Sequence, residues 1–303
     1  MRESTTKRKD WLTEGLSAED KVFVSGSDAF SERIGATGQL TLRIFGHHPL
    51  NETPPSDPTE RRTWLPSYYK IPFVVLTCEM ERQDAVDSFN PYAERRIRDY
   101  LSNALGLPTY LVAYSRDNLN LAEAFHITSP NNVSELQTPS DFANQINRLR
   151  AGRLEDEPED RKAINKSLND VFQIFTRSLV SWQFSINDVD VLVTAPGGVI
   201  FLELKRSSVT PWQPYLDDAA NYLLMRSLTR LVPKGIDFTL RYDLDRPTEV
   251  EVHTILGISR EVIPGFRKKV SGPNECSVIK EVLALLRDPD IQAYGSQKSR
   301  VNN

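Results

Sequence analysis

Four charged residues, Asp188, Asp190, Glu203 and Lys205, interrupt two apolar segments in the second half of the chain. They lie in DVDVLVTAPGGVIFLELK, which spans residues 188–205. Two neighbouring carboxylates could bind a divalent cation such as Mg²⁺, which takes carboxylate and carbonyl oxygens. An adjacent ammonium group could stabilise negative charge that develops on a phosphate or on an attacking water. The alternative interpretation is a solvated sheet face with cross-strand ion pairs.

The turn between the two segments predicts how these charges meet. Both segments have the β-branched and apolar richness of strands, and the Pro-Gly-Gly at 196–198 is typical of a turn. Antiparallel pairing about this turn places Asp190 opposite Glu203. The same pairing places Asp188 opposite Lys205. Side chains alternate along a strand, so all four would share one face. A register slip of one residue would reverse this assignment.

The remaining side chains of the second segment predict the opposite face of the hairpin. Ile200, Leu202 and Leu204 alternate with the charged residues and would point into a core. Two facing carboxylates repel each other, so a nearby positive charge is expected to offset the repulsion. Lys205 supplies one such charge, and a metal ion would supply more.

The segment resembles the PD-(D/E)xK nuclease superfamily. Asp190, twelve intervening residues and then Glu203-Leu204-Lys205 are similar to its signature. The local text is most similar to the nuclease-related-domain branch, and the resemblance covers about residues 160–260. It implies that Asp190 and Glu203 bind Mg²⁺ or Mn²⁺ together with the carbonyl of Leu204. It also implies that Lys205 orients or activates the attacking water, so Asp190, Glu203 and Lys205 would be the catalytic residues.

The resemblance also implies a fold, a restriction-endonuclease-like α/β core. Its order is a helix, a three-stranded meander, a second helix and a further strand. The sequence patterns predict helices at 163–180 and 215–232, a strand at 181–186, and strands at 238–244 and 249–259. This order agrees with the superfamily core.

One departure from the superfamily pattern supports a different function. Many members carry a glutamate on the first helix, but here Asp170 lies about 150° from the centre of the apolar stripe, at ~100° per residue. Asp170 should therefore face solvent, and only Asn165, Ser167 and Asn169 lie nearer the edges of the stripe. The missing acid supports the alternative of a catalytically weak or inactive nucleic-acid-binding or scaffold protein on a nuclease fold.

The first half of the chain also has an α/β pattern. Residues 69–81 and 109–115 are predicted strands that flank a predicted helix at 90–108. Glu79-Met80-Glu81-Arg82 aligns with residues 203–206. This alignment indicates that the two halves of the chain could be copies of one ancestral domain. The alternative is two unrelated α/β segments that share a common order of elements. The acidic segment 151–162 is typical of a linker. We therefore expect an α/β domain of uncertain role at 1–150, with a degenerate nuclease-like copy as one interpretation, and a PD-(D/E)xK-like nuclease domain at 151–303.

Composition limits the function classes. The chain has 303 residues, 39% hydrophobic and 26% charged, and a net charge of −4. It contains neither an apolar stretch of the ~20 residues that span a bilayer nor a signal-peptide core at its start. Cys78 and Cys276 form no disulfide framework, which favours a reducing cytoplasm. The histidines show no ligand spacing.

A nucleic-acid-binding protein with negative net charge must concentrate its basic residues locally. The candidates are Lys205-Arg206, Arg226 with Arg230, and the segment 260–269. Ordinary solvated charges are the alternative. The leading expectation is a Mg²⁺-dependent deoxyribonuclease in phage defence, restriction or repair. DNA is the expected partner, RNA ranks lower, and a homodimer or a further protein partner stays open.

Overall fold

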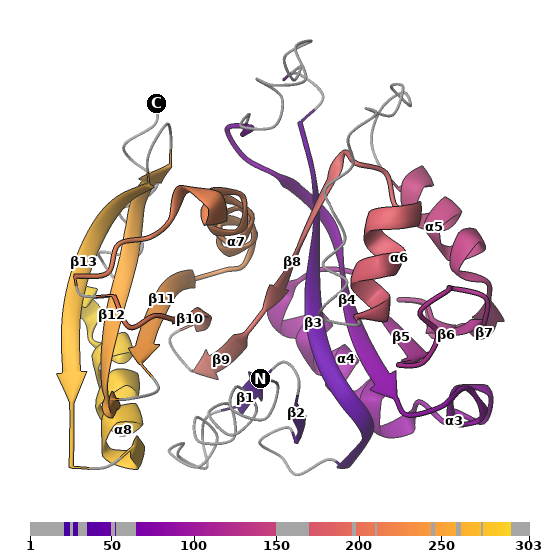
Figure 1. The fold of residues 1–303 in the computed structure, drawn as a ribbon, viewed down its shortest axis with the longest axis horizontal. Helices are drawn as coiled ribbons and strands as arrows, with labels where there is room; N and C mark the ends of the chain where they lie inside the picture. The colour runs from indigo at the N-terminus through magenta and orange to yellow at the C-terminus, as the bar shows by residue number, and fades with distance from the viewer. Residues whose placement is uncertain are drawn as a thin grey trace. The chain divides into compact units, whose positions relative to one another are not determined.

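The computed structural model divides the chain into two compact units (Figure 1). Residues 36–188 form the continuous unit, and residues 1–35 with 189–303 form the discontinuous unit. The structure describes residues 21–24, 27–29, 35–49, 52, 65–149, 170–195, 198–209, 211–243, 246–258, 262–273 and 275–291. This division differs from the predicted boundary at residue 150. The expected linker, 151–162, lies outside the described residues.

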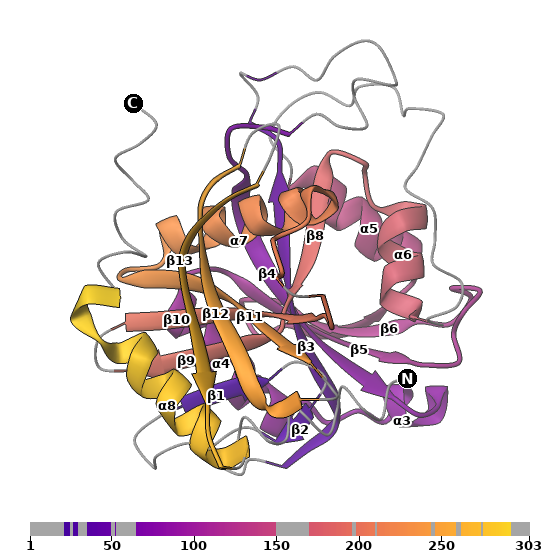
Figure 2. The same ribbon diagram turned by 60° about the vertical axis from the view of Figure 1, so that its left-hand side comes forward.

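The discontinuous unit is built on one mixed sheet with the strand order β1-β9-β10-β11-β12-β13. The strands are β1 (Lys21–Val24), β9 (Val191–Ala195), β10 (Gly198–Arg206), β11 (Gly235–Asp243), β12 (Arg246–Ile258) and β13 (Val262–Ser271). Only the β10–β11 pair is parallel. The 3-10 helix η2 (Leu216–Asp218) and helix α7 (Ala219–Leu231) make this crossover, and α8 (Glu275–Arg287) follows β13. Figure 2 shows α7 and α8 with these strands.

The predicted hairpin register is confirmed. Gly198 pairs with Ala195, and the ladder runs to Leu202 opposite Val191, as expected for a turn at 196–197. Gly198 has φ +140°, and a Cβ at this position would lie 2.3 Å from the carbonyl oxygen of Lys234. Glycine is therefore required where the chain re-enters the sheet.

The core of the discontinuous unit also follows the predicted alternation. Ile200 and Leu202 are buried in a cluster with Phe238 of β11 and Val282 of α8, and Leu204 packs against its edge. The face of β10 that carries Phe201, Glu203 and Lys205 is the opposite one. Helix α7 lies on that second face, because Thr229 of α7 bonds Asp237 and Lys205 lies over the ring of Tyr222.

The continuous unit contains the other sheet, in which β3 to β7 are adjacent in chain order and β8 also pairs with β3. Its strands are β3 (Gly35–His47), β4 (Lys70–Met80), β5 (Thr109–Ser115), β6 (Phe125–Thr128), β7 (Ser134–Gln137) and β8 (Phe184–Val189). Its helices are α3 (Gln83–Asp87), α4 (Tyr92–Leu105), α5 (Pro139–Arg148) and α6 (Val171–Leu179). The short strand β2 (Ser27–Ala29) precedes β3 in the chain. The predicted strand, helix and strand between residues 69 and 115 are confirmed.

The expected three-stranded meander does not form in chain order. The predicted strand at 181–186 corresponds to β8, which pairs with β3 of the continuous unit. The neighbour of β9 is instead β1, with Phe23 opposite Leu192. The predicted helix at 163–180 begins at Val171 in the described residues and packs through Phe172 and Phe175 into the core of the continuous unit. The structure is therefore mixed α/β, and the strand that pairs with β9 is β1 instead of the expected β8.

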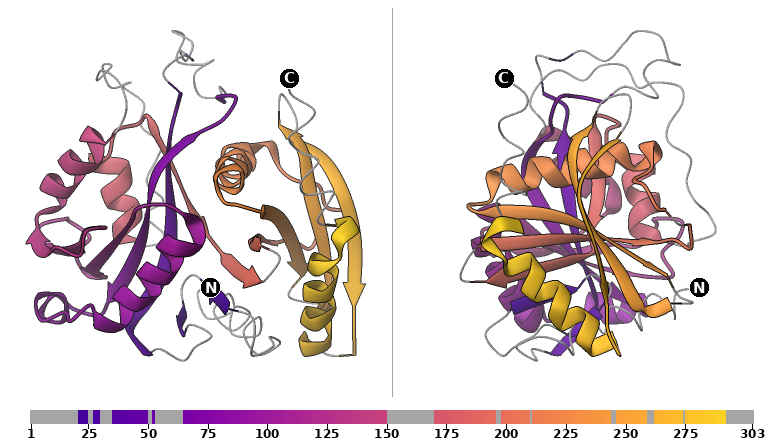
Figure 3. Two further views of the ribbon diagram at one scale, coloured as in Figure 1. Left: turned by 180° about the vertical axis from the view of Figure 1, so that it is seen from behind. Right: turned by 90° about the vertical axis from the view of Figure 1, so that its left-hand side faces the viewer.

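The two units nevertheless share one order of elements. Each has an antiparallel hairpin (β3–β4 or β9–β10), a crossover helix (α4 or α7) and a parallel strand (β5 or β11). Two antiparallel strands (β6–β7 or β12–β13) and a final helix (α5 or α8) follow. Figure 3 shows α4 on the opposite sheet face from α5 and α6, and shows α8 across one face of β10–β13. In each unit, the final helix therefore covers the sheet face opposite the crossover helix.

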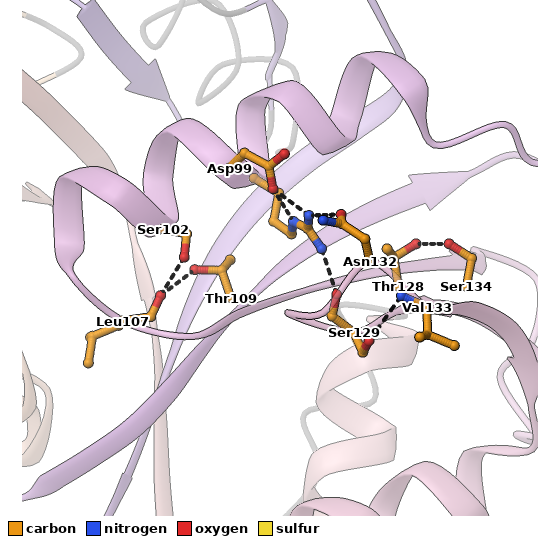
Figure 4. A network of polar contacts seen from close by, with 10 residues as sticks. Asp99, Ser102, Leu107, Thr109, Thr128, Ser129, Asn132, Val133 and Ser134 are labelled. Atoms are coloured by element: carbon orange, nitrogen blue, oxygen red, sulfur yellow. Dashed lines mark hydrogen bonds and ion pairs between the residues drawn. The ribbon is translucent and has the colours of Figure 1, made fainter.

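A buried arginine secures each crossover helix to its sheet. Arg98 of α4 donates to the carbonyl of Ser129 at 2.7 Å and contacts Asp99 and Asn132 in the network of Figure 4. Arg226 of α7 donates to the carbonyl of Ile255. Arg226 is buried, so its predicted place in an exposed basic patch is wrong.

Among the described residues, no helix is long and apolar enough to cross a membrane.

Candidate active site

Asp190 lies at the open end of the β9–β10 hairpin, immediately before β9. Its Oδ2 accepts a hydrogen bond from the backbone N–H of Leu204 at 2.9 Å. The side chain of Asp190 therefore continues the ladder between β9 and β10 beyond Val191. This contact places the carboxylate beside Glu203, as the hairpin register predicts.

Glu203 is a buried acid with one unsatisfied oxygen. Only 8% of the residue is exposed. Its Oε1 lies 3.1 Å from Nζ of Lys205, whereas its Oε2 is buried without a hydrogen-bond partner among the described residues. Burial and the negative charge of Asp190 raise the pKa of Glu203 to about 8, although Lys205 opposes this shift. Asp190 therefore lies close enough to disfavour the ionised form of Glu203.

Lys205 is held between two carboxylates. Its Nζ lies 3.1 Å from Glu203 and 3.0 Å from Oδ2 of Asp218, and it sits 5.5 Å from the ring centroid of Tyr222. Burial alone would lower the pKa of Lys205, but Glu203 and Asp218 outweigh burial and raise the pKa. The ammonium group is therefore charged and fixed in direction.

Asp218 is a site residue that the sequence analysis missed. It ends η2 and stands immediately before α7, so the start of the crossover helix delivers its carboxylate to Lys205. The available signal was the Asp217-Asp218 pair at the predicted start of this helix. Nothing in the spacing shows which of the two acids faces the hairpin, and the structure shows that Asp217 is exposed.

Asp188 does not lie opposite Lys205, and this part of the prediction is wrong. Asp188 belongs to β8 of the continuous unit, where its Oδ1 lies 3.0 Å from Nη1 of the buried Arg43. Burial alone would lower the pKa of Arg43, but Asp188 and Asp170 outweigh burial and raise it. The pairing of β8 with β3 separates Asp188 from the hairpin ladder.

Asp170 is also placed differently from the expectation. It is the N-cap of α6 and accepts a hydrogen bond from the N–H of Gln173 at 3.0 Å. Its carboxylate is only partly exposed and lies 3.7 Å from Arg43. Asp170 therefore caps a helix and pairs with Arg43 within the continuous unit. Asn165, Ser167 and Asn169 lie outside the described residues.

The donors at the hairpin suit a hard cation that keeps open positions. They are the carboxylates of Asp190 and Glu203, with the carbonyl of Leu204 as the further predicted ligand. Within the described ranges, no group of three or more His, Cys, Asp or Glu residues is placed to hold a metal. Mg²⁺ is often bound by one or two carboxylates, with water and phosphate oxygens completing six positions. The unsatisfied Oε2 of Glu203 fits this chemistry.

A second ionic cluster lies on the same sheet face. Buried Glu251 of β12 lies 3.7 Å from Arg241, 3.1 Å from Arg267 and 3.2 Å from His253. Burial tends to raise the pKa of Glu251, but Arg267, His253 and Arg241 lower it below its ordinary value. Trp212 packs on His253 with ring centroids 4.8 Å apart, so the imidazole has a packing role in this cluster.

On β4 of the continuous unit, the face toward α4 carries no acid among the described residues. The proposed alignment matched Glu79 with Glu203, but the two side chains lie on different faces relative to their crossover helices. Residues 73 and 75 of β4 join the core beneath α5 and α6, and the strand's alternation puts Glu79 on that face. The residues of β4 that face α4 are the buried Cys78 and Met80. The alignment is therefore shifted by one residue, which exchanges faces.

Comparisons with known proteins assign no family to the chain. No protein-family model and no curated protein matches it. A solved structure titled "Crystal structure of Sex pheromone staph-cAM373 precursor" aligns over 87% of this chain and 89% of its own, with 10% identity and a TM-score of 0.20. A similarity this low carries no argument about fold or function.

Proposed function

We propose that the protein is a metal-dependent endonuclease that hydrolyses DNA phosphodiester bonds with Mg²⁺ or Mn²⁺. The observation that carries this proposal is the buried, unpartnered Oε2 of Glu203 beside Asp190 and Lys205. A buried polar atom without a partner costs free energy, on the order of 1–3 kcal/mol. Such a cost is expected where a bound cation restores the missing interaction.

The order of elements around this site supports a restriction-endonuclease-like core. The hairpin β9–β10 carries the acids and the lysine, α7 crosses over, and β11 returns parallel to β10. In this proposal β1 takes the place of the first meander strand. The discontinuous unit is then the nuclease. The continuous unit is a degenerate copy, in which Cys78 and Met80 of β4 face the crossover helix where β10 carries its charged residues.

Each side chain has a separate role in the proposed hydrolysis. Asp190, Glu203 and the carbonyl of Leu204 would hold the cation. When bound, the cation polarises the phosphate and lowers the pKa of a water. Lys205 donates a hydrogen bond to the attacking water or to a phosphate oxygen, where its charge stabilises the developing negative charge. The water loses a proton to solvent and forms a new P–O bond, one P–O ester bond breaks, and the leaving oxygen takes a proton from solvent.

The setting of the activity remains part of the proposal. Restriction, phage defence or repair would each use a DNA endonuclease, and a homodimer would provide two sites for two strands. A reducing cytoplasm is the compartment that we propose, because the chain has only two cysteines, Cys78 and Cys276.

A non-catalytic nucleic-acid-binding or scaffold protein is the second candidate. It is favoured by the two-acid site, because the described residues supply no third acidic ligand. It is also favoured by the two carboxylates that already neutralise Lys205.

Metal-dependent nicking of plasmid DNA separates the two candidates. The protein is incubated with Mg²⁺, Mn²⁺ or EDTA, beside Glu203→Gln and the matched variant Glu281→Gln, whose acid is exposed on α8. We expect nicking by the wild type and by Glu281→Gln only with metal, and background nicking by Glu203→Gln. Intact DNA binding without cleavage in any metal would support the scaffold candidate. Full activity of a folded Glu203→Gln variant would place the active site elsewhere.

A further inference from the structure

We propose that Arg267 and Lys269 on β13 form a contact surface for the DNA backbone beside the candidate site. This inference rests on the proposed function and deepens it, because it names where the substrate strand lies. The contact is with phosphate, so it carries no sequence preference of its own.

The register of four strands places this surface in line with the site. Consecutive Cα partners run Glu203, Thr239, His253 and Arg267 in one row, and Lys205, Arg241, Glu251 and Lys269 in the next. Side chains of one row share a sheet face. Arg267 and Lys269 therefore belong to the face that carries Glu203 and Lys205.

The spacing of the rows matches a nucleic-acid strand. Three strand intervals of ~4.8 Å separate β10 from β13, which amounts to about 14 Å. Duplex DNA rises ~3.4 Å along its axis per step, and successive phosphates of one strand are farther apart than this rise because the backbone winds around the axis, so the span covers fewer than four phosphate steps. Thr239 and His253, which lie between the two ends of this row, are buried, so a substrate bound at Glu203 and Lys205 would reach β13 around the covered part of the face, where the side chain of Arg267 is exposed.

Buried Glu251 orients the guanidinium of Arg267. One nitrogen, Nη2, donates to Oε1 of Glu251 at 3.1 Å, while 43% of the side chain is exposed. A guanidinium has five N–H donors in a planar fork, so several remain for a bidentate phosphate contact. Glu251 also contacts Arg241 and His253, so its single negative charge faces more than one cation. The surplus positive charge is exposed at Arg267.

Lys269 is the weaker member of the surface. Its Nζ lies 2.7 Å from Oε2 of Glu249, and 54% of its side chain is exposed. This exposed pair largely neutralises the ammonium group. We therefore expect a graded contribution, with Arg267 larger than Lys269.

The chain offers a matched control at the next position. Lys268 is exposed like its neighbours, but it pairs with the buried Val252 and lies on the opposite face of β13. Replacing Arg267 or Lys268 by glutamine removes one positive charge from nearly the same place in the molecule. Only the first replacement removes it from the face that carries the site.

The test measures binding of a fluorescein-labelled DNA duplex by anisotropy, with EDTA present so that no cleavage occurs. At ~0.1 M salt we expect Arg267→Gln to raise the Kd about eightfold and to reduce the slope of log Kd against log salt by about 0.9, the effect of one lost phosphate contact. Lys269→Gln should raise the Kd less, and Lys268→Gln should leave it unchanged. Arg267→Lys, which keeps the charge, should retain most of the affinity.

Several outcomes would overturn the surface. Equal effects of Arg267→Gln and Lys268→Gln would show a long-range charge effect instead of a contact. An unchanged Kd in Arg267→Gln, with its fold verified by circular dichroism, would remove Arg267 from the interface. Tighter binding of an RNA duplex of the same sequence would contradict the DNA assignment.

Failure of this surface is distinguishable from failure of the proposed function. If the wild type cleaves DNA while Arg267→Gln binds normally, only the surface is wrong. If the wild type neither binds nor cleaves DNA, the nuclease proposal fails first.

Discussion

At the scale of single residues, the candidate site is a balance of four charges. Glu203 and Asp218 flank the ammonium of Lys205, and Asp190 lies beside the buried Glu203. The direction of Lys205 depends on both of its carboxylate partners. Asp218 is the partner that does not belong to the hairpin, so its removal should loosen the lysine without removing a predicted metal ligand.

We expect Asp218→Asn to lower kcat for DNA cleavage by about tenfold to a hundredfold with little change in KM, because a mispositioned charge acts mainly on the transition state. Asp217→Asn is the matched control, since its acid is adjacent and exposed. Single-turnover cleavage over a range of pH tests both variants. The pH profile of Asp218→Asn should move to lower pH, because one of the carboxylates that raise the pKa of Lys205 is gone. Identical kinetics in the two variants would remove Asp218 from the site.

A second prediction concerns the metal-free stability of the protein. The pKa of Glu203 is about 8 in the folded chain, against 4.5 as its ordinary value. Between these pH values the folded state binds more protons than the unfolded state, so the free energy of unfolding falls as pH rises. In EDTA, raising the pH from about 5 to about 8 should therefore lower the wild-type thermal midpoint relative to that of Glu203→Gln.

The comparison of thermal midpoints should also respond to metal and to the site of the mutation. Saturating Mn²⁺ should reduce the difference in pH dependence, since a bound cation favours the ionised form of Glu203. Glu281→Gln should follow the wild type. Parallel pH curves for Glu203→Gln and the wild type in EDTA would show that Glu203 does not titrate in this range.

The sequence identified the residues whose positions follow from local periodicity. Asp190 and Glu203 meet because both belong to one hairpin whose register its turn defines. Asp188 fails the same rule because the chain leaves this ladder between residues 188 and 191. Asp218 was not predictable because its contact with Lys205 depends on how the crossover helix docks. No spacing pattern encodes that docking.

At the scale of elements, short-range pairings were predictable and long-range ones were not. The hairpin β9–β10, the helix between β10 and β11, and the order β4–α4–β5 all join neighbours in the chain. By contrast, β1 pairs with β9, and β8 pairs with β3. Each of these outer strands is short, and each could in principle join either hairpin. The choice depends on packing across sequence distances that periodicity does not describe.

At the scale of the whole molecule, the predicted C-terminal domain, 151–303, includes strands whose partners lie in the first 50 residues. Residues 151–303 contain α6 and β8 without their partner β3, and they contain β9 without β1. We expect this fragment to lack a cooperative thermal transition. A permuted chain of residues 189–303 joined through a flexible linker to residues 1–35 restores the strand pairing, and it should unfold cooperatively.

Circular dichroism melting of both chains checks this expectation, with the full-length protein as the reference. The linker length is varied to confirm that it does not limit folding. A cooperative transition of the 151–303 fragment at the full-length midpoint would contradict the division of the chain described above.

The pairing of β1 with β9 also has a consequence for the chain as it is made on the ribosome. Val24 and its partner Val191 are separated by 167 residues, the difference of their numbers. At ~5–20 residues per second, β1 leaves the ribosome roughly 8–33 seconds before its partner strand. During that interval the continuous unit gains its hairpin and crossover helix first, while the β9–β10 hairpin does not yet exist. Of the two units, the discontinuous one is therefore completed later, and the candidate acids come together only at that stage.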